Sequence, residues 1–264
     1  MGYAELNSKI STAIEARMTT DYDPIAEQYK QSKEQPWRRY VEAFSFMNLI
    51  GDPANKAIID VACGEGFYTR KLRKAGASKV TGVDLSEKMI ALARAAEREE
   101  RLGIDFMVAD ARDLRFDVKY DLAVAAYILN YARDRGELTA MCRAIAGCLK
   151  PGGRFVTVNS NPRCDFSSAP SYRKYGFETS VVGDFREGAP ITWTFHLDDS
   201  QFQIENYFLD IDTHEQAFRT AGFQEIQWHR PAIAPEGKAA YGGEYWSDLL
   251  EHPPIILITC TLRQ

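Results

Sequence analysis

A chain of 264 residues, 45% of them hydrophobic, is long enough to form one domain with a large core. Its formal net charge of −5 and its pI near 5.5 argue against a nucleic-acid partner, whose phosphates require a basic surface. The five cysteines and four histidines show no metal-ligand spacing, and no apolar run reaches membrane-spanning length, so we expect a reduced, cytoplasmic protein without a metal.

The first part of the chain predicts helices. Residues 1–20 are polar and indicate a loosely docked start. The pair Asp23-Pro24 is typical of a helix start, with proline at the first helical position. Tyr22 and Tyr29 fall on the apolar face of this helix. A second amphipathic helix is predicted over residues 36–50.

Residues 57–67 indicate a buried strand that runs through a glycine turn into a helix. Apolar residues flank Asp60, and Gly64 and Gly66 follow. Because glycine has no Cβ, these positions let the backbone turn sharply and approach a ligand. The turn suits a dinucleotide pyrophosphate or the amino-acid end and ribose of S-adenosylmethionine, with a plain structural turn as the alternative. The dinucleotide pattern requires a third glycine, where this chain has Thr69.

Strands and helices then alternate, which predicts a parallel sheet with helices on both faces. Asp84 ends the second strand at the distance downstream at which a carboxylate holds a ribose diol. Asp110 ends the third strand in the same way. The further strands are expected at residues 80–84, 106–110, 121–126 and 154–159.

Residues 161–210 form an insert rich in aromatic residues. Residues 191–196 alternate as a half-buried strand, and residues 202–209 are expected to pair with them as a hairpin. We expect a small antiparallel cap over a substrate pocket, whose aromatic walls suit a flat heteroaromatic or polyketide-like substrate. The alternative is that these aromatic residues only attach the cap to the core. The substrate contacts selected here are Trp193, Phe195 and Tyr175.

The end of the chain is expected to complete the sheet. A helix closed by Gly222 is followed by strands over residues 224–230 and 255–262. The long loop between these strands carries Tyr245 and Trp246, which we also select as substrate contacts. No repeat or linker marks a second independent domain. The parts expected are an N-terminal helical gate (1–55), a cofactor-binding core (56–160), the cap insert (161–210) and the C-terminal part of the core (211–264).

Five motifs in their order resemble those of the class I S-adenosylmethionine-dependent methyltransferases over roughly residues 56–160. One departure is Ala62, where the family often has glycine. The resemblance implies S-adenosylmethionine as cofactor and a doubly wound, Rossmann-like seven-stranded α/β sheet, mostly parallel with an antiparallel last strand. The matching residues are Asp60-Val61-Ala62-Cys63-Gly64-Glu65-Gly66, Gly82-Val83-Asp84-Leu85-Ser86, Ala109-Asp110-Ala111, Tyr120-Asp121-Leu122 and Leu149-Lys150-Pro151-Gly152-Gly153.

The resemblance also implies a set of cofactor contacts. The first helix, with its tyrosines, would fold over the cofactor as part of a substrate gate, or else simply pack on the sheet. Met89 would face the adenine unless it is a core residue, and Asp110 would accept a hydrogen bond from the adenine amine unless it only caps a helix. Arg38 or Arg39 would meet the cofactor carboxylate, although surface arginines are commoner. The residues assigned to the cofactor are Tyr22, Tyr29, Arg38, Asp60, Ala62, Cys63, Gly64, Gly66, Asp84, Leu85, Met89, Asp110, Ala111 and Ala126.

The segment after the fourth strand is expected to face the methyl group, because ligands of open α/β sheets bind beyond the carboxyl ends of the strands. It lacks the Asn/Asp-Pro-Pro-aromatic signature of methyltransferases that act on nucleic-acid amines. An acceptor nitrogen in a ring needs no strong base, whereas a phenol would gain from one. No histidine stands at a telling spacing. The candidates for the reaction site are Tyr127, Asn130, Tyr131 and His196.

Within the family, Asn130–Asp134, Tyr175-Gly176 and Tyr245-Trp246 are similar to the N-methyltransferases of toxoflavin-type azapteridine biosynthesis. That likeness implies N-methylation of a small, planar heteroaromatic or secondary-metabolite acceptor by a monomer or homodimer. Two other classes remain as alternatives. One is a nicotinamide-dependent oxidoreductase, against which Thr69 argues, and the other is a non-catalytic S-adenosylmethionine-binding scaffold.

Overall fold

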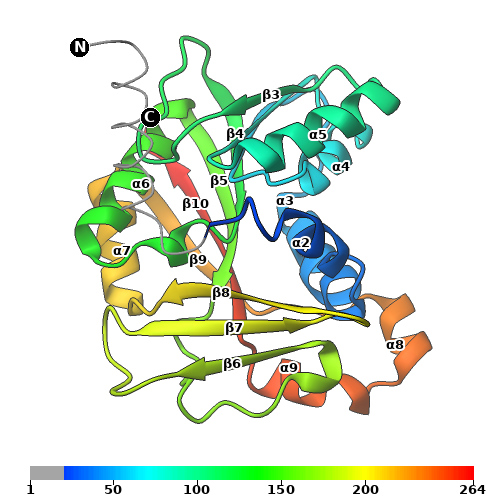
Figure 1. The fold of residues 1–264 in the computed structure, drawn as a ribbon. Coiled ribbons are helices and arrows are strands. Elements are labelled where there is room, and N and C mark those ends of the chain that lie inside the picture. Colours follow the sequence, from blue (N-terminus) through cyan, green and yellow to red (C-terminus); the bar gives the residue numbers. More distant parts are fainter. Residues whose placement is uncertain (1–20) are drawn as a thin grey trace, which may run out of the picture.

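The computed structural model describes residues 21–264, so the predicted loosely docked start and the first part of the predicted gate lie outside the described residues. Its main feature is a seven-stranded sheet (Figure 1). The first five strands are parallel, whereas the last strand is antiparallel to both neighbours, which confirms the predicted Rossmann-like α/β fold. In spatial order the strands are β3 (Asp105–Val108), β2 (Lys79–Asp84), β1 (Ala57–Val61), β4 (Tyr120–Ala126), β5 (Leu149–Ser160), β10 (Ile255–Leu262) and β9 (Phe223–His229).

Side chains of the central strands alternate between two buried clusters, because successive residues of a strand point to opposite faces of a sheet. Ile58 belongs to one cluster and its neighbour Ile59 to the other. Figure 1 shows the corresponding helices on opposite sides of the sheet. The first cluster is covered by α3 (Phe44–Ile50) and α4 (Phe67–Lys74), and the second by α6 (Arg135–Cys148) and α7 (Ile211–Thr220).

The first of the two N-terminal helices differs from its predicted start. Residues 23–25 form a turn, and α2 (Ala26–Ser32) begins only after it. The Asp23 carboxylate accepts a hydrogen bond from the Ser86 hydroxyl, so it is engaged with the core rather than capping its own helix. The second helix begins at Pro36, as predicted, and passes through a π-helical segment, η1 (Arg38–Ala43), before it continues as α3. Such π-helical turns occur frequently at functional sites.

A separate antiparallel sheet lies across one end of the core, drawn yellow to yellow-green in Figure 1. It consists of β6 (Phe177–Val181), β7 (Pro190–His196) and β8 (Gln201–Tyr207). The predicted hairpin is confirmed as β7 and β8, in which Trp193 stands opposite Ile204. The sequence does not predict β6, because its three central residues are polar and interrupt the apolar pattern.

The segment between β9 and β10 is partly helical, where a long loop is predicted. Trp246 is fully buried there, and its Nε1 donates a hydrogen bond to the Gly237 carbonyl oxygen at 3.1 Å. Each helix is too short to display a period of apolar residues, which is why the sequence does not reveal it. The helices are α8 (Pro235–Tyr241), η4 (Glu244–Trp246) and α9 (Ser247–Glu251).

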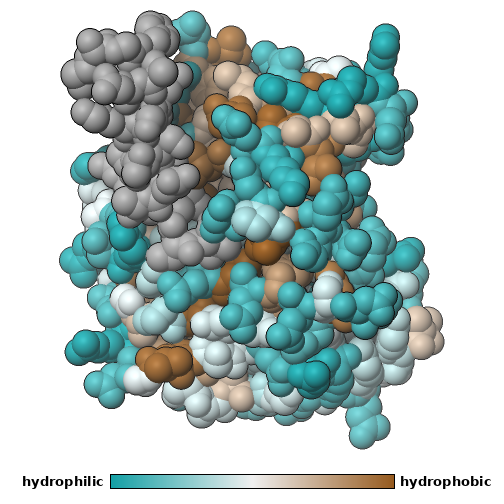
Figure 2. Space-filling view, in the orientation of Figure 1, coloured by the Kyte–Doolittle hydropathy of each residue, from teal (hydrophilic) through white to brown (hydrophobic). Residues whose placement is uncertain are grey.

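The surface carries few signs of a membrane or metal role. Within residues 21–264, no helix combines the length and apolar character needed to cross a membrane. The same residues contain no group of three or more side chains arranged to hold a metal ion. Figure 2 shows hydrophobic side chains in the middle and upper parts of this face and at its lower left edge, among mostly hydrophilic side chains.

Candidate active site

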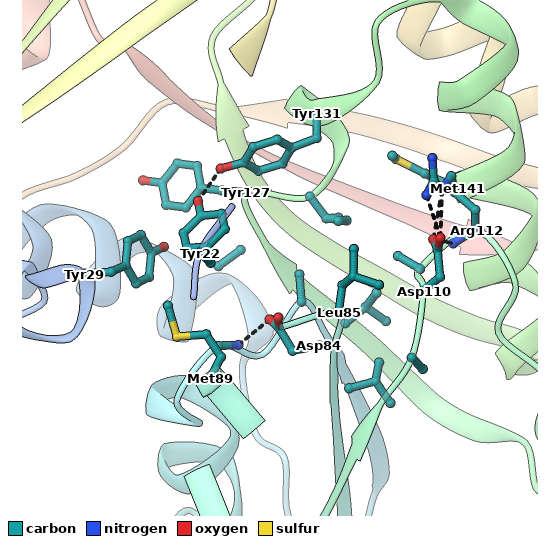
Figure 3. Close-up of a pocket in the computed structure, with 18 of the residues that line it drawn as sticks. Tyr22, Tyr29, Asp84, Leu85, Met89, Asp110, Arg112, Tyr127, Tyr131 and Met141 are labelled. Atoms are coloured by element: carbon teal, nitrogen blue, oxygen red, sulfur yellow. Dashed lines mark hydrogen bonds and ion pairs between the residues drawn. The ribbon is translucent and has the colours of Figure 1, made fainter. Parts of the chain in front are cut away.

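A hollow of about 810 Å³ lies beyond the carboxyl ends of β1, β2 and β4, where the sequence places a ligand. Figure 3 shows Tyr22 and Tyr131 meeting at one side of it, Asp84 and Met89 at a second, and Asp110 with Arg112 at a third. The predicted cofactor residues that line the hollow are Tyr22, Tyr29, Ala62, Gly64, Asp84, Leu85, Met89, Asp110, Ala111 and Ala126, while Arg38, Asp60, Cys63 and Gly66 are outside its lining.

The glycine turn owes its shape to left-handed backbone. Ala62, Gly64 and Gly66 have φ values of +59°, +56° and +87°. A Cβ added to Gly66 would lie 2.8 Å from the Phe106 Cζ, so this glycine is also required for close packing. A left-handed conformation is disfavoured for alanine, which explains why the resembled family often has glycine where this chain has Ala62.

Asp84 is held at the rim of this turn by two backbone groups. Its Oδ2 accepts a hydrogen bond from the Gly64 N–H at 2.8 Å, and its Oδ1 accepts one from the Ser86 N–H at 2.9 Å. Burial raises the pKa of Asp84, and these hydrogen bonds oppose that shift. A carboxylate offers about four acceptor positions, so two remain for the hydroxyls of a ribose in the hollow.

Asp60 lies behind the turn and is buried. The Thr69 hydroxyl donates a hydrogen bond to its Oδ2 at 2.6 Å. Thr69, which replaces the third glycine of a dinucleotide turn, therefore serves as the partner of a buried acid. Cys63 is buried as well, and its N–H donates to the Val83 carbonyl oxygen at 2.9 Å. Both residues shape the turn from behind.

The Asp60 carboxyl gives the stability of the protein a pH dependence. Burial raises its pKa from 3.8 to about 7, so between these values the folded state binds more protons than the unfolded state and stability falls as pH rises. The Asp60→Asn variant keeps an oxygen for Thr69 and lacks the titration. From pH 5 to pH 8 we expect wild-type protein to lose on the order of 2 kcal/mol more unfolding free energy than this variant. Urea denaturation at both pH values measures the difference, and parallel pH profiles would contradict it.

The third side of the hollow contains residues that the sequence does not single out. The Arg112 guanidinium donates to both Asp110 oxygens, with Nε–Oδ1 at 2.9 Å and Nη2–Oδ2 at 2.6 Å. Glu137 and Met141 of α6 complete this wall. Asp110 is thus ion-paired at the place predicted for an adenine. In the sequence, only the position of Arg112 two residues after Asp110 could have predicted this ion pair. Nothing in the sequence predicts that α6, which lies further along the chain, contributes Glu137 and Met141 to the same wall.

The reaction-site candidates after β4 separate into two groups. Tyr127 and Tyr131 line the hollow, and the Tyr131 hydroxyl is hydrogen-bonded to the hydroxyl of Tyr22. Asn130, in the short η2 (Leu129–Tyr131), lines a different small cavity, and no described residue is a hydrogen-bond partner of its amide. Tyr127 has a left-handed φ of +64°, an uncommon conformation for a bulky residue.

A fully buried acid, Glu42, holds Tyr127 in place. Its carboxylate accepts hydrogen bonds from the hydroxyls of Tyr127 and Tyr68 at 2.5 and 2.7 Å. It also pairs with Arg38 Nη1 at 2.9 Å and with Lys33 Nζ at 3.5 Å. Burial alone would raise the pKa of Glu42, but the two cations and the two tyrosine hydrogen bonds bring it below its ordinary value. Glu42 was not among the predicted site residues, although its spacing of four residues from Arg38 on one helix is typical of an ion pair.

A second, narrow cavity adjoins the hollow; its volume of about 10 Å³ is close to the room that one water molecule needs. Tyr29 and Tyr127 line both, so these two rings form the boundary between them. Arg38 lies in the second cavity and is buried, which excludes the alternative of a surface arginine. The remaining residues of its lining are Trp37, Trp193, Phe195, Ile204 and Asn206.

The other predicted substrate and reaction-site residues lie outside both linings. Tyr175 stacks on Trp246 with ring centroids 5.8 Å apart, and Tyr245 packs edge-on against both. The His196 side chain points to the face of β7 opposite Phe195, because successive strand residues alternate. Its Nε2 is 2.8 Å from a Glu178 carboxylate oxygen.

Comparison with known proteins agrees with this geometry. Residues 58–153 match the family model of the methyltransferase domain. A demethylmenaquinone methyltransferase of Lactococcus lactis is 28% identical over 222 residues, which are 81% of each chain. A ubiquinone biosynthesis O-methyltransferase of Bordetella bronchiseptica is 32% identical over 117 residues, 43% of this chain and 47% of the relative. The core of the chain therefore matches a methyltransferase domain, and the chain is similar to methyltransferases over most of its length.

The fold of this methyltransferase is shared with solved structures. An S-adenosylmethionine-dependent methyltransferase from Mesorhizobium loti superposes with a TM-score of 0.61 at 24% identity, covering 87% of this chain and 99% of that one. The match to the methyltransferase domain implies S-adenosylmethionine as the cofactor, and the left-handed glycine turn beside the Asp84 carboxylate fits it. The finer likeness to toxoflavin-type N-methyltransferases stays a prediction.

Proposed function

We propose that this methyltransferase methylates a small, planar aromatic acceptor, with a ring nitrogen as the favoured acceptor atom, and that the acceptor binds between the walls of the second cavity, which must move apart to admit a ring. The observation that carries the proposal is the shared boundary of the two cavities. Because Tyr29 and Tyr127 line both, a ligand on one side of these rings is next to a ligand on the other. Direct methyl transfer requires the methyl carbon and the acceptor atom to lie about 3–3.5 Å apart, so the transfer must pass between the rings of Tyr29 and Tyr127 and not through them.

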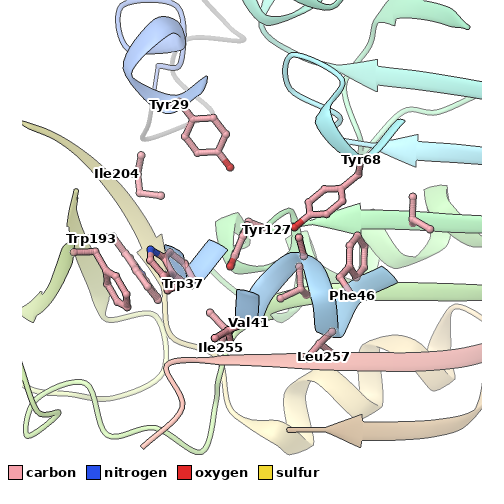
Figure 4. Close-up of a cluster of buried hydrophobic side chains, with 14 of the residues drawn as sticks. Tyr29, Trp37, Val41, Phe46, Tyr68, Tyr127, Trp193, Ile204, Ile255 and Leu257 are labelled. Carbon is pink, nitrogen blue, oxygen red and sulfur yellow. The ribbon is translucent and has the colours of Figure 1, made fainter. Parts of the chain in front are cut away.

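The walls of the second cavity suit a flat ring. Trp193 and Phe195 project from β7 with their rings nearly parallel, at an interplanar angle of 13°. Figure 4 shows Trp193 and Ile204 of the cap facing Trp37 and Tyr127 of the core. The cofactor supplies a methyl group that is already activated as a sulfonium. The protein's task is therefore to hold the acceptor in line and exclude water.

The titratable side chains in the second cavity favour nitrogen as the acceptor atom. They are two phenols and a guanidinium, Tyr29, Tyr127 and Arg38, none of which takes up a proton at neutral pH. Burial raises the pKa of Tyr127 well above its ordinary value, and its hydroxyl already donates to Glu42. A ring nitrogen with a free lone pair needs no base, whereas a phenol must lose a proton. O-methylation of a quinol-type acceptor is the second candidate, because the relatives are named for menaquinone and ubiquinone biosynthesis.

The proposal is tested by screening matched acceptors with S-adenosylmethionine and measuring S-adenosylhomocysteine by mass spectrometry. We expect transfer to planar nitrogen heterocycles and less to their hydroxylated carbocyclic counterparts or to non-planar amines. Trp193→Ala should lower kcat/KM for those heterocycles by about tenfold or more, since an aromatic wall is removed. Trp228→Ala, on β9 and outside both linings, is the matched control. Exclusive methylation of phenols would favour the second candidate, and cofactor binding without any transfer would favour a scaffold.

A further inference from the structure

Two buried N–H groups in the second cavity lack partners. Arg38 and Trp193 are each 2% exposed. Among the described residues, neither the Arg38 Nε nor the Trp193 Nε1 has a hydrogen-bond partner. Buried donors are nearly always satisfied in folded proteins, because leaving one unpaired is costly. Both belong to the lining of one cavity, so a single ligand can satisfy both.

The other three tryptophans differ from Trp193, because each of their indole N–H groups has a hydrogen-bond acceptor. The Nε1 groups of Trp37, Trp228 and Trp246 donate to the Gln35 side chain, the Glu215 carboxylate and the Gly237 carbonyl oxygen at 3.1, 3.3 and 3.1 Å. Trp193 is as deeply buried as Trp37 and Trp246 but has no such acceptor beside it.

The buried carboxylate next to Arg38 does not accept a hydrogen bond from the Arg38 Nε. Glu42 already accepts from Tyr68, Tyr127, Lys33 and Arg38 Nη1, which uses the acceptor positions of a carboxylate. The guanidinium is also fixed in place, since its central carbon lies 4.8 Å from the Trp37 ring centroid and 4.9 Å from that of Phe195. A fixed cation with a free N–H binds an anionic oxygen more strongly than a neutral one.

We propose that the acceptor carries an anionic oxygen, such as a carboxylate, which accepts hydrogen bonds from Arg38 Nε and Trp193 Nε1 while its ring lies beside Tyr127. This inference rests on the proposed function and adds the charge of the substrate. A carboxylate could also come from the methionine end of the cofactor. The acceptor is the assigned source, because both donors line the second cavity and neither lines the hollow.

Calorimetric titration of the protein saturated with S-adenosylhomocysteine tests the assignment with two probes, quinoline-4-carboxylate and its carboxamide. We expect the carboxylate to bind at least tenfold more tightly. Trp193→Phe keeps the aromatic wall and removes one donor, so it should reduce this preference several-fold. Arg38→Gln should abolish it, and the exposed neighbour Arg39, changed to Gln, should leave it intact. Should Arg38→Gln fail to fold, the Trp193→Phe result decides.

Different failures have different meanings. Equal affinities for the two probes, or an unchanged preference in Trp193→Phe, would overturn the anionic acceptor while leaving the proposed function standing if neutral heterocycles are methylated. If no planar heterocycle is bound or methylated, the proposed function and this inference both fail. A separate titration compares S-adenosylhomocysteine with 5′-methylthioadenosine, which lacks the carboxylate. Weakening of the first alone by Arg38→Gln would assign Arg38 to the cofactor and overturn the acceptor assignment.

Discussion

Asp84→Ala is expected to weaken the binding of S-adenosylmethionine by more than about 100-fold, because a hydrogen bond to a charged group contributes about 1.5–3 kcal/mol and a ribose diol would lose two. The fold should persist. Burial raises the pKa of Asp84, so its carboxylate is held in a costly environment when the protein is empty, and removing it does not leave a core cavity. Calorimetric titration measures the affinity, and thermal unfolding the stability.

The control for this variant is Asp113→Ala. Asp113 also follows β3, but its side chain is 70% exposed and pairs only with Arg115 at the surface, at 2.9 Å. We expect its cofactor affinity to equal that of wild-type protein. An unchanged affinity in Asp84→Ala would show that Asp84 does not hold the ribose and that the position of the cofactor in the hollow is different.

Glu42→Gln is expected to lower the free energy of unfolding by about 3 kcal/mol or more, because removing one partner of a buried ion pair leaves the other charge uncompensated. Here two cations, Lys33 and Arg38, would lose their carboxylate. The exposed Glu34→Gln is the matched control, with little expected effect. Adding Lys33→Met to Glu42→Gln should recover part of the loss, since one unpaired charge is then removed.

The same variant has a predictable pH dependence. The pKa of Glu42 is below its ordinary value of 4.5 in the folded protein, so its contribution to stability is present above pH 4.5 and is lost as pH falls through the folded pKa. The deficit of Glu42→Gln relative to wild type should therefore shrink in acid. Urea denaturation at pH 7 and at pH 4 measures both values. A deficit under about 1 kcal/mol at pH 7 would mean that Lys33 and Arg38 are well solvated without Glu42.

The sheet and the cofactor side of the site could be predicted because their signals are local. An acidic or small residue stands at the end of each of the strands β1, β2 and β3 or within two residues after it. Gly64 and Gly66 mark the turn, because its left-handed backbone favours glycine. The alternation of β7 and β8 is equally visible. By contrast, Lys33 and Glu42 are charged residues inside an apolar region, where sequence patterns predict a solvated face. Only the tertiary fold brings Tyr68 and Tyr127 to them.

The lining of the second cavity was harder to predict, because it too depends on tertiary contacts. Trp193 and Phe195 line a cavity, since they alternate inward along one strand, and their contact with a substrate stays a prediction. Tyr175, Tyr245 and Trp246 were equally aromatic, but they pack on one another. Composition cannot distinguish an aromatic wall from an aromatic core. The unpartnered Nε1 of Trp193 is a property of its surroundings, and no sequence pattern carries it.

Two residues in left-handed conformations stand at the ends of adjacent strands, Ala62 after β1 and Tyr127 after β4, and both line the hollow. Each such conformation costs on the order of 1–3 kcal/mol and persists only when the surrounding structure enforces it. The protein meets that cost when it folds. The backbone at these strand ends is therefore pre-organised before the cofactor binds, and binding should cost little further conformational entropy there.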